Sequence, residues 1–321
     1  MMQREDRLVE YLESSFLQDL LKKKGVTDIS YNGVALFYVS NTEGRKKYEG
    51  EVSSQEVGDF LRQIANYSEK QFSYLDPVLD VSFDKYRLSA MFLSLVRVNN
   101  RKAYSFSLRV ASTESVLEND DGFFPGNTKE ILLDALNKGK SIVIGGETGT
   151  GKTELQKFLL RHLEPCTRVI VIDNVQELEL SRGDGKLDLT SWVVDERNQK
   201  ASFSALIRAA LRNNPDYLLV AESRGGEMLD ALSVVMAGHP IITTFHAKDI
   251  QAMPYRMARM AMMCEKKLEF DDLLSDIYHH FSVFVYLKKS YIHGKAYRRI
   301  ESIGILKEAT HTIEIMWEEG K

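Results

Sequence analysis

The feature that most constrains the fold of this chain is a glycine-rich loop between an apolar run and an amphipathic segment. Residues 142–144 form the apolar run, and residues 146–153 match the pattern G-x-x-x-x-G-K-S/T. Apolar side chains then recur at helical spacing over residues 155–163. A strand, a loop and a helix in this order are the context in which the pattern binds phosphate.

This loop predicts a site for a nucleoside triphosphate and Mg²⁺. Glycines allow successive backbone N–H groups to face one concave surface, with the positive end of the following helix behind them. We expect Lys152 to reach the β- and γ-phosphates and the Thr153 hydroxyl to bind Mg²⁺. The residues expected at the nucleotide are Glu147, Thr148, Gly149, Thr150, Gly151, Lys152, Thr153 and Glu154. The alternative is a glycine-rich turn that carries a lysine by chance, which the flanking segments disfavour.

Composition is typical of a globular protein large enough for two domains. A net charge of −4 over 321 residues gives no global attraction to nucleic acid, so we predict no direct sequence-specific nucleic-acid binding. The two cysteines are far apart in sequence, which disfavours a zinc knuckle or a disulfide framework. No apolar stretch approaches the roughly 18 residues of a membrane span. We therefore expect a cytoplasmic protein, with at most peripheral membrane association.

An N-terminal α/β domain is predicted over residues 1–112. Helical spacing of apolar residues indicates one helix that ends near Gly25. Ser53 and Glu56 have the spacing of a capping box at the start of a second amphipathic helix. Strands are expected at residues 34–39, 87–92 and 104–109.

A linker over residues 113–128 leads to a second domain over residues 129–321. Short, continuously apolar strands alternate there with helices, which predicts a mainly parallel sheet covered on both faces. These strands are expected at residues 142–144, 169–172, 217–220 and 241–245. From residue 281 onward we expect antiparallel strands, with a turn at His293 and Gly294.

Chemically active side chains follow three of the expected parallel strands. Ligands gather at the carboxyl ends of such strands, so Glu222 is predicted to bind beside the γ-phosphate and Mg²⁺ and to polarise the attacking water. Asp173 is a second candidate for the metal or the water. His246 could sense the γ-phosphate. The alternatives are an exposed glutamate at a strand end and a structural histidine.

The order of these motifs resembles the secretion and traffic ATPases of type IV secretion, conjugation, type II secretion and type IV pili. The likeness rests on residues 145–153, 172–178, 210–225 and 238–247, and extends to residues 27–33, 76–80, 86–88 and 297–303. It implies a RecA-like ATPase domain and assembly as a homo-hexamer. It also implies membrane-embedded secretion or conjugation channel proteins as partners, at the inner face of the cytoplasmic membrane.

The resemblance also assigns roles to arginines. It implies that Arg87 and Arg109 of the N-terminal domain reach the phosphates. It makes Arg224 a catalytic candidate, and Arg208, Arg212 or Arg224 could act on a neighbour's site as an arginine finger. A structural role is preferred for Arg208.

Within the family, the absence of a Cys-x-x-Cys pair favours the type IV secretion or conjugation branch over type II secretion, with pilus retraction as the weaker alternative. Asn174 after Asp173, Ala221 before Glu222, and Glu154 beside the loop depart from the family pattern. They favour a rival hypothesis, a nucleotide-binding conformational scaffold with little or no hydrolysis. Intact Lys152 and Glu222 favour the active motor. A small-molecule kinase is a remote third hypothesis, because no lid segment follows the loop.

Overall fold

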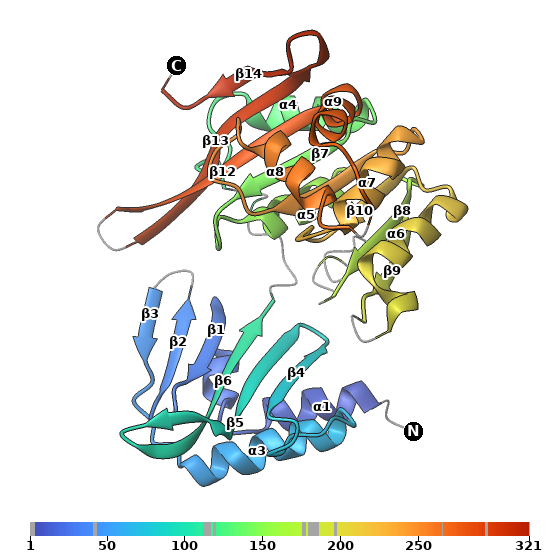
Figure 1. The fold of residues 1–321 in the computed structure, drawn as a ribbon. Coiled ribbons are helices and arrows are strands. Elements are labelled where there is room, and N and C mark those ends of the chain that lie inside the picture. The colour runs from blue at the N-terminus through green and yellow to red at the C-terminus, as the bar shows by residue number, and fades with distance from the viewer. Residues whose placement is uncertain are drawn as a thin grey trace. The chain divides into compact units, whose positions relative to one another are not determined.

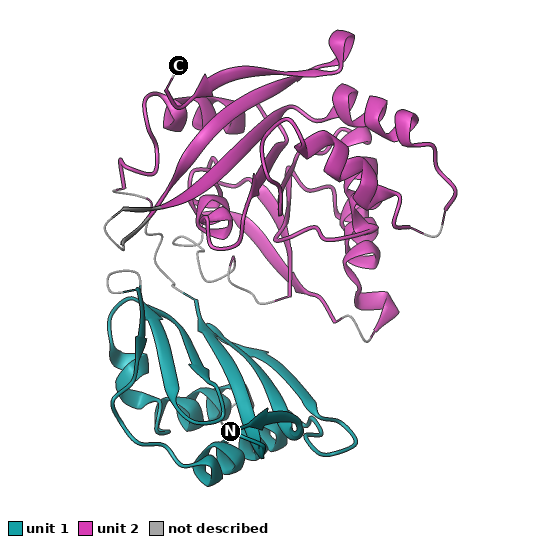
Figure 2. Ribbon diagram, turned by 60° about the vertical axis from the view of Figure 1, so that its left-hand side comes forward, with its two compact units in different colours: residues 1–113, 291–296 teal, residues 114–290, 297–321 magenta. Residues whose placement is uncertain are grey.

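The computed structural model describes residues 4–40, 44–111, 117, 120–174, 178, 186–195, 198–264, 266–292 and 295–320 (Figure 1). The chain divides into two units (Figure 2). The first unit contains residues 1–113 and 291–296, and the second contains residues 114–290 and 297–321. Each unit has a sheet and a core of its own.

The first unit contains an antiparallel sheet with the strand order β3-β2-β1-β6-β5-β4. Its strands are β1 (Val26–Tyr31), β2 (Leu36–Ser40), β3 (Gly44–Lys47), β4 (Val78–Phe83), β5 (Tyr86–Val98) and β6 (Arg101–Val110). Residues of β4 alternate strictly between exposed and buried, as expected for a sheet with one covered face. Helices α1 (Arg4–Glu13) and α3 (Ser54–Tyr67) lie along that covered face (Figure 1).

The prediction of a single helix before Gly25 is wrong, because the chain forms two helices there. Helix α1 ends at Glu13, and α2 spans Gln18–Lys22. The hydroxyls of Ser14 and Ser15 donate hydrogen bonds back to the carbonyls of Tyr11 and Leu12. The Ser15 hydroxyl also accepts from the N–H of Leu17. These local bonds compete with the helical pattern and allow the chain to turn.

The capping box predicted at the start of α3 is confirmed. The Ser53 hydroxyl accepts from the N–H of Glu56 at 3.1 Å, and the Glu56 carboxylate accepts from the N–H of Ser53 at 3.1 Å. Helix α3 therefore begins with two of its backbone donors satisfied.

The second unit contains an eight-stranded sheet with the order β14-β13-β12-β7-β11-β10-β8-β9. Its strands are β7 (Ile142–Gly146), β8 (Arg168–Asp173), β9 (Asp188–Val193), β10 (Tyr217–Val220), β11 (Ile241–Phe245), β12 (Val283–Ile292), β13 (Lys295–Lys307) and β14 (Thr312–Glu318). All pairs from β12 to β9 are parallel, whereas β13 and β14 pair antiparallel.

Helices cover both faces of this second sheet. Val143 of β7 packs into one apolar core, and its neighbours Ile142 and Ile144 pack into the core on the other face. The helices are α4 (Thr128–Asn137), α5 (Lys152–Arg161), α6 (Phe203–Ala210), α7 (Glu227–Met236), α8 (Met253–Ala261) and α9 (Phe270–His280).

The predicted α/β class is confirmed, with an N-terminal domain that has an antiparallel sheet and helices and a C-terminal domain that has a mainly parallel sheet. The expected antiparallel tail is correct for β13 and β14, but β12 pairs parallel with β7. The turn predicted at His293 and Gly294 lies outside the described residues, as do residues 175–177 and most of residues 112–119. Among the described helices, none has the length and apolar character needed to cross a membrane.

Candidate functional site

The glycine-rich loop runs from the end of β7 to the first turn of α5. Gly149 and Gly151 have φ angles of 75° and 97°, which favour glycine because a Cβ would be strained there. A Cβ on Gly146 would lie 2.7 Å from the Thr150 Oγ1. The Thr150 hydroxyl itself donates to the Glu147 carbonyl at 2.9 Å. The loop is thus a tight backbone cradle that side chains at these positions would fill.

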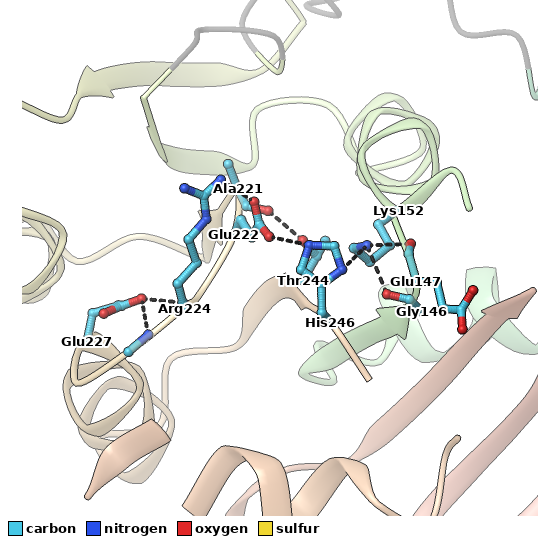
Figure 3. Close-up of polar contacts among 10 residues, drawn as sticks. Gly146, Glu147, Lys152, Ala221, Glu222, Arg224, Glu227, Thr244 and His246 are labelled. Carbon is cyan, nitrogen blue, oxygen red and sulfur yellow. Dashed lines mark hydrogen bonds and ion pairs between the residues drawn. The ribbon is translucent and has the colours of Figure 1, made fainter. Parts of the chain in front are cut away.

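Lys152 places its ammonium group inside this loop. Its Nζ donates to the carbonyls of Gly146 and Glu147 at 3.0 and 2.9 Å (Figure 3). A third contact of 3.3 Å joins Nζ to His246 Nδ1. The residue is only 8% exposed, so its charge lies in a partly desolvated position where it interacts strongly with an anion.

His246 connects the lysine to a carboxylate. It follows β11, and its Nε2 lies 3.1 Å from Glu222 Oε1 (Figure 3). Because a lysine ammonium can only donate, Nδ1 must accept the bond from Lys152. The proton of a neutral imidazole then sits on Nε2 and is donated to Glu222. The contacts therefore assign one tautomer to His246.

Glu222 follows β10 and is also held by Arg224, whose Nη2 lies 2.7 Å from Glu222 Oε2. Burial raises the pKa of the Glu222 carboxyl. The hydrogen bond from Arg224, together with the charge of Arg224, the imidazole of His246 and the charge of Lys152, outweighs burial and brings the pKa below its ordinary value. The side chain is therefore an ionised carboxylate at neutral pH.

Backbone contacts fix the segment that carries Glu222. The Thr244 hydroxyl of β11 donates to the Ala221 carbonyl at 2.8 Å, and the Ser223 N–H donates to the Thr244 carbonyl at 2.8 Å. From α5, the fully buried Gln156 donates its Nε2 to the Val220 carbonyl at 3.0 Å. The backbone segment that carries Glu222 is thus bonded both to the neighbouring strand β11 and to helix α5.

Side chains with oxygen donors lie at the start of α5 and at the carboxyl ends of two strands of the parallel sheet. Thr153 follows Lys152 in the first turn of α5, Glu222 comes two residues after the end of β10, and the buried Asp173 is the last residue of the neighbouring strand β8. One hydroxyl and carboxylates are the ligands that this hard cation prefers, and phosphate oxygens and water complete its shell. The residues present therefore fit Mg²⁺.

Other predicted site residues have partners of their own. The Glu154 carboxylate lies 2.8 Å from the Nζ of the buried Lys157, one turn along α5. Arg109 lies 3.7 Å from Asp28 on the next strand of the first unit. The roles predicted for Glu154, Arg109 and Arg87 at the phosphates stay predictions. Arg208 pairs with Asp230 at 3.3 Å, in agreement with the structural role preferred for it.

Two cations that the sequence analysis did not select also reach the loop. Arg298 Nε of β13 donates to the Gly149 carbonyl at 2.7 Å, and Lys289 Nζ of β12 donates to the Thr148 carbonyl at 3.4 Å. Neither belongs to a phosphate-binding pattern. A signal was present in the adjacent basic pairs at residues 288–289 and 298–299, but which member of each pair faces the loop depends on strand register.

Comparison with known proteins identifies relatives of the chain. The model of a family described as type II/IV secretion system protein matches residues 93–276, which is more than half of the chain. An uncharacterised protein of Bacillus anthracis is 28% identical over 88% of this chain and 65% of its own length. The type IV secretion system protein PtlH of Bordetella pertussis is 36% identical over 43% of this chain and 41% of its own length. The chain thus spans less than two thirds of the length of these relatives.

Solved structures share the fold. The Legionella pneumophila ATPase DotB aligns with a TM-score of 0.66 and 20% identity, over 95% of this chain and 81% of DotB. The pilus retraction motor PilT, solved with bound ADP, aligns with a TM-score of 0.63 and 16% identity, over 92% of this chain and 84% of PilT.

Proposed function

The chain belongs to the family of type II/IV secretion system proteins, and from this we propose that it is an ATPase that energises a type IV secretion or conjugation machine. The observation that carries the proposal is the continuous series of contacts from Lys152 through His246 and Glu222 to Arg224. These residues come from the carboxyl ends of three neighbouring parallel strands, where α/β proteins bind their ligands.

In the proposed reaction, the loop and Lys152 hold the phosphates of ATP. The backbone N–H groups and the positive end of α5 favour the negative charge, and Lys152 adds a full charge. Thr153 and Glu222, with Asp173, would hold Mg²⁺. Mg²⁺ held there would supply positive charge that stabilises the negative charge developing during phosphoryl transfer.

Glu222 is proposed to orient the attacking water. Its lowered pKa makes it a weak base, so its contribution is to accept a hydrogen bond from the water and fix its direction rather than to retain the proton. Arg224 and His246 each hold one carboxylate oxygen, which restricts the rotation of the group. Positioning of this kind supplies much of the catalysis in phosphoryl transfer.

Assembly and location are part of the same proposal. We place the protein in a homo-hexamer at the cytoplasmic face of the membrane, where it would contact channel proteins of the machine. PilT, which shares the fold, is described as a motor. Arg87 and Arg109 are proposed to reach the phosphates, and Arg212 is a candidate for a role at a neighbouring subunit's site.

One observation favours a second candidate, a conformational scaffold that binds ATP with little hydrolysis. Both carboxylate oxygens of Glu222 are engaged, one with Arg224 and the other with His246. Ala221 also stands where many P-loop enzymes carry a second acid. A scaffold would bind ATP and ADP but release little phosphate.

The deciding experiment measures steady-state phosphate release with Mg²⁺ over a series of protein concentrations, with the molecular mass read in parallel by size-exclusion chromatography. Wild type is compared with Glu222→Gln, and Glu314→Gln serves as a control because its carboxylate pairs with Lys307 on β13. Turnover that rises with a hexameric species and disappears only in Glu222→Gln supports the motor. Nucleotide binding without turnover at any concentration supports the scaffold.

A further inference from the structure

The strands β12 and β13 bring two positive charges to the tip of the glycine-rich loop. The Arg298 guanidinium and the Lys289 ammonium donate to the carbonyls of consecutive residues, Gly149 and Thr148. The aliphatic part of Arg298 continues along the loop, since its Cδ lies 3.9 Å from the position of a Cβ on Gly151. Both cations therefore contact the loop on one side.

Carbonyl contacts of this kind orient the peptide groups of the loop. In a trans peptide the C=O and N–H bonds point in opposite directions. Hydrogen bonds to the carbonyls of Thr148 and Gly149 therefore turn the N–H groups of Gly149 and Thr150 away from β12 and β13. Backbone N–H groups of such a loop are the donors that bind phosphate.

Each cation interacts with an electron-rich carbonyl of the loop, and such charge-assisted hydrogen bonds are stronger than neutral ones. Gly149 is also restricted from this side, because a Cβ there would lie 3.3 Å from Lys289 Nζ as well as being strained by its positive φ.

We propose that Lys289 and Arg298 are positioning residues of the nucleotide site, which hold the loop tip in its phosphate-binding conformation. This inference rests on the proposed function, because it assumes that the loop binds ATP and ADP. The residues act on binding, whereas Glu222 and His246, which follow other strands, act on the reaction. Loss of either cation is therefore expected to raise KM and the ADP Kd and to leave kcat at saturating ATP nearly unchanged.

The strands also provide matched controls. Lys288 and Arg299 are the sequence neighbours of the two cations and face the other way, as alternate residues of a strand do. Lys288 pairs with Glu301, and Arg299 Nη1 lies 2.7 Å from Glu319 Oε1. Each control removes the same charge from the same strand without removing a contact to the loop.

The test is calorimetric titration of the full chain with Mg²⁺ and ADP, together with kcat and KM for ATP. Arg298→Gln is expected to weaken ADP binding about tenfold, as loss of a charged hydrogen bond does, and Lys289→Gln about threefold because its contact is longer. Arg299→Gln and Lys288→Gln should stay within about twofold of wild type. Arg298→Lys, which keeps a charged donor, should recover part of the loss.

The proposal is overturned if Arg298→Gln and Arg299→Gln bind ADP with equal affinity, whether both keep the wild-type affinity or both lose it. A fall in kcat with KM unchanged would also overturn it. The melting temperature without nucleotide checks folding, and Lys289→Gln provides the answer if Arg298→Gln does not fold. If wild type binds neither ADP nor ATP, the proposed function fails as well. Wild-type binding with an unaffected Arg298→Gln rejects this inference alone.

Discussion

The two units differ in what they bury. Among the residues that the structure describes, the buried polar or charged side chains other than tyrosines belong almost entirely to the second unit. The exception is Ser40 of the first unit. Several of those lie at the glycine-rich loop or beside the strands that carry Glu222 and His246. They are Thr150, Lys152, Gln156, Asp173, Ser223, Thr243 and Thr244.

This difference separates stability from chemistry. Burying a polar group costs free energy unless the group is hydrogen-bonded. Polar groups that are concentrated in one core therefore suggest that they serve a function there. The first unit, with an apolar core on one face of its sheet, depends on packing. Substitutions in its core should change folding, whereas substitutions at the polar groups of the second unit should change binding or turnover.

The largest expected effect is on turnover in the second unit. Glu222→Gln removes the charge that we propose orients the attacking water but keeps the size of the side chain, and we expect phosphate release to fall about 10²- to 10³-fold. ADP affinity should change by less than about threefold, because the loop and Lys152 are intact. Phosphate release and calorimetric titration give both values. A variant with wild-type turnover would remove Glu222 from the proposed reaction.

The next effect is on stability in the first unit. Leu61 of α3 is fully buried, and Leu61→Ala should lower the free energy of unfolding of this unit by about 2–5 kcal/mol. Urea unfolding followed by circular dichroism measures the change. ADP affinity should remain at the wild-type value. A parallel loss of ADP affinity would show that the two units do not separate stability from binding.

A smaller loss of stability is expected from the capping box. Ser53→Ala removes the hydroxyl that accepts from the Glu56 N–H, and it should cost about 1 kcal/mol of the same unfolding free energy. Ser53→Asp keeps a capping acceptor and should restore most of the loss. Equal stability of wild type and Ser53→Ala would show that α3 is held by packing alone.

The subtlest effect concerns pH. Burial raises the pKa of Glu222, and Arg224 makes the largest contribution among the groups that lower it, so Arg224→Gln should raise that pKa. Turnover needs the ionised carboxylate, so the acidic limb of the pH profile should move to higher pH. Arg208→Gln, which breaks a pair with Asp230, is the control. An unmoved acidic limb would mean that Arg224 does not set this pKa.

Regular patterns made much of the second unit predictable. Its central strands are continuously apolar and short, and the loop between β7 and α5 has a pattern tied to one conformation. Placing Glu222 and His246 at strand ends in a parallel sheet was enough to bring them together. The family likeness supported the same order of motifs.

Features that depend on local competition or on long-range register were not predictable. The break between α1 and α2 depends on whether the Ser14 and Ser15 hydroxyls bond to the backbone, which apolar spacing does not report. Arg298 and Arg299 look equivalent in sequence. Only the register of β13 decides that Arg298 meets the loop and Arg299 meets Glu319. Gln156 likewise looks like an ordinary helix residue.

Gln156 fixes the distance between helix α5, which begins at Lys152, and strand β10, which precedes Glu222. Its amide joins α5, which starts at Lys152, to Val220, which lies two residues before Glu222. A displacement of about 1 Å between reacting groups can lower the rate a hundredfold. The hydrogen bond of this one side chain therefore restricts how far α5 and β10 can move relative to each other. Anyone who transplants this loop into another scaffold should move Gln156 and Val220 with it.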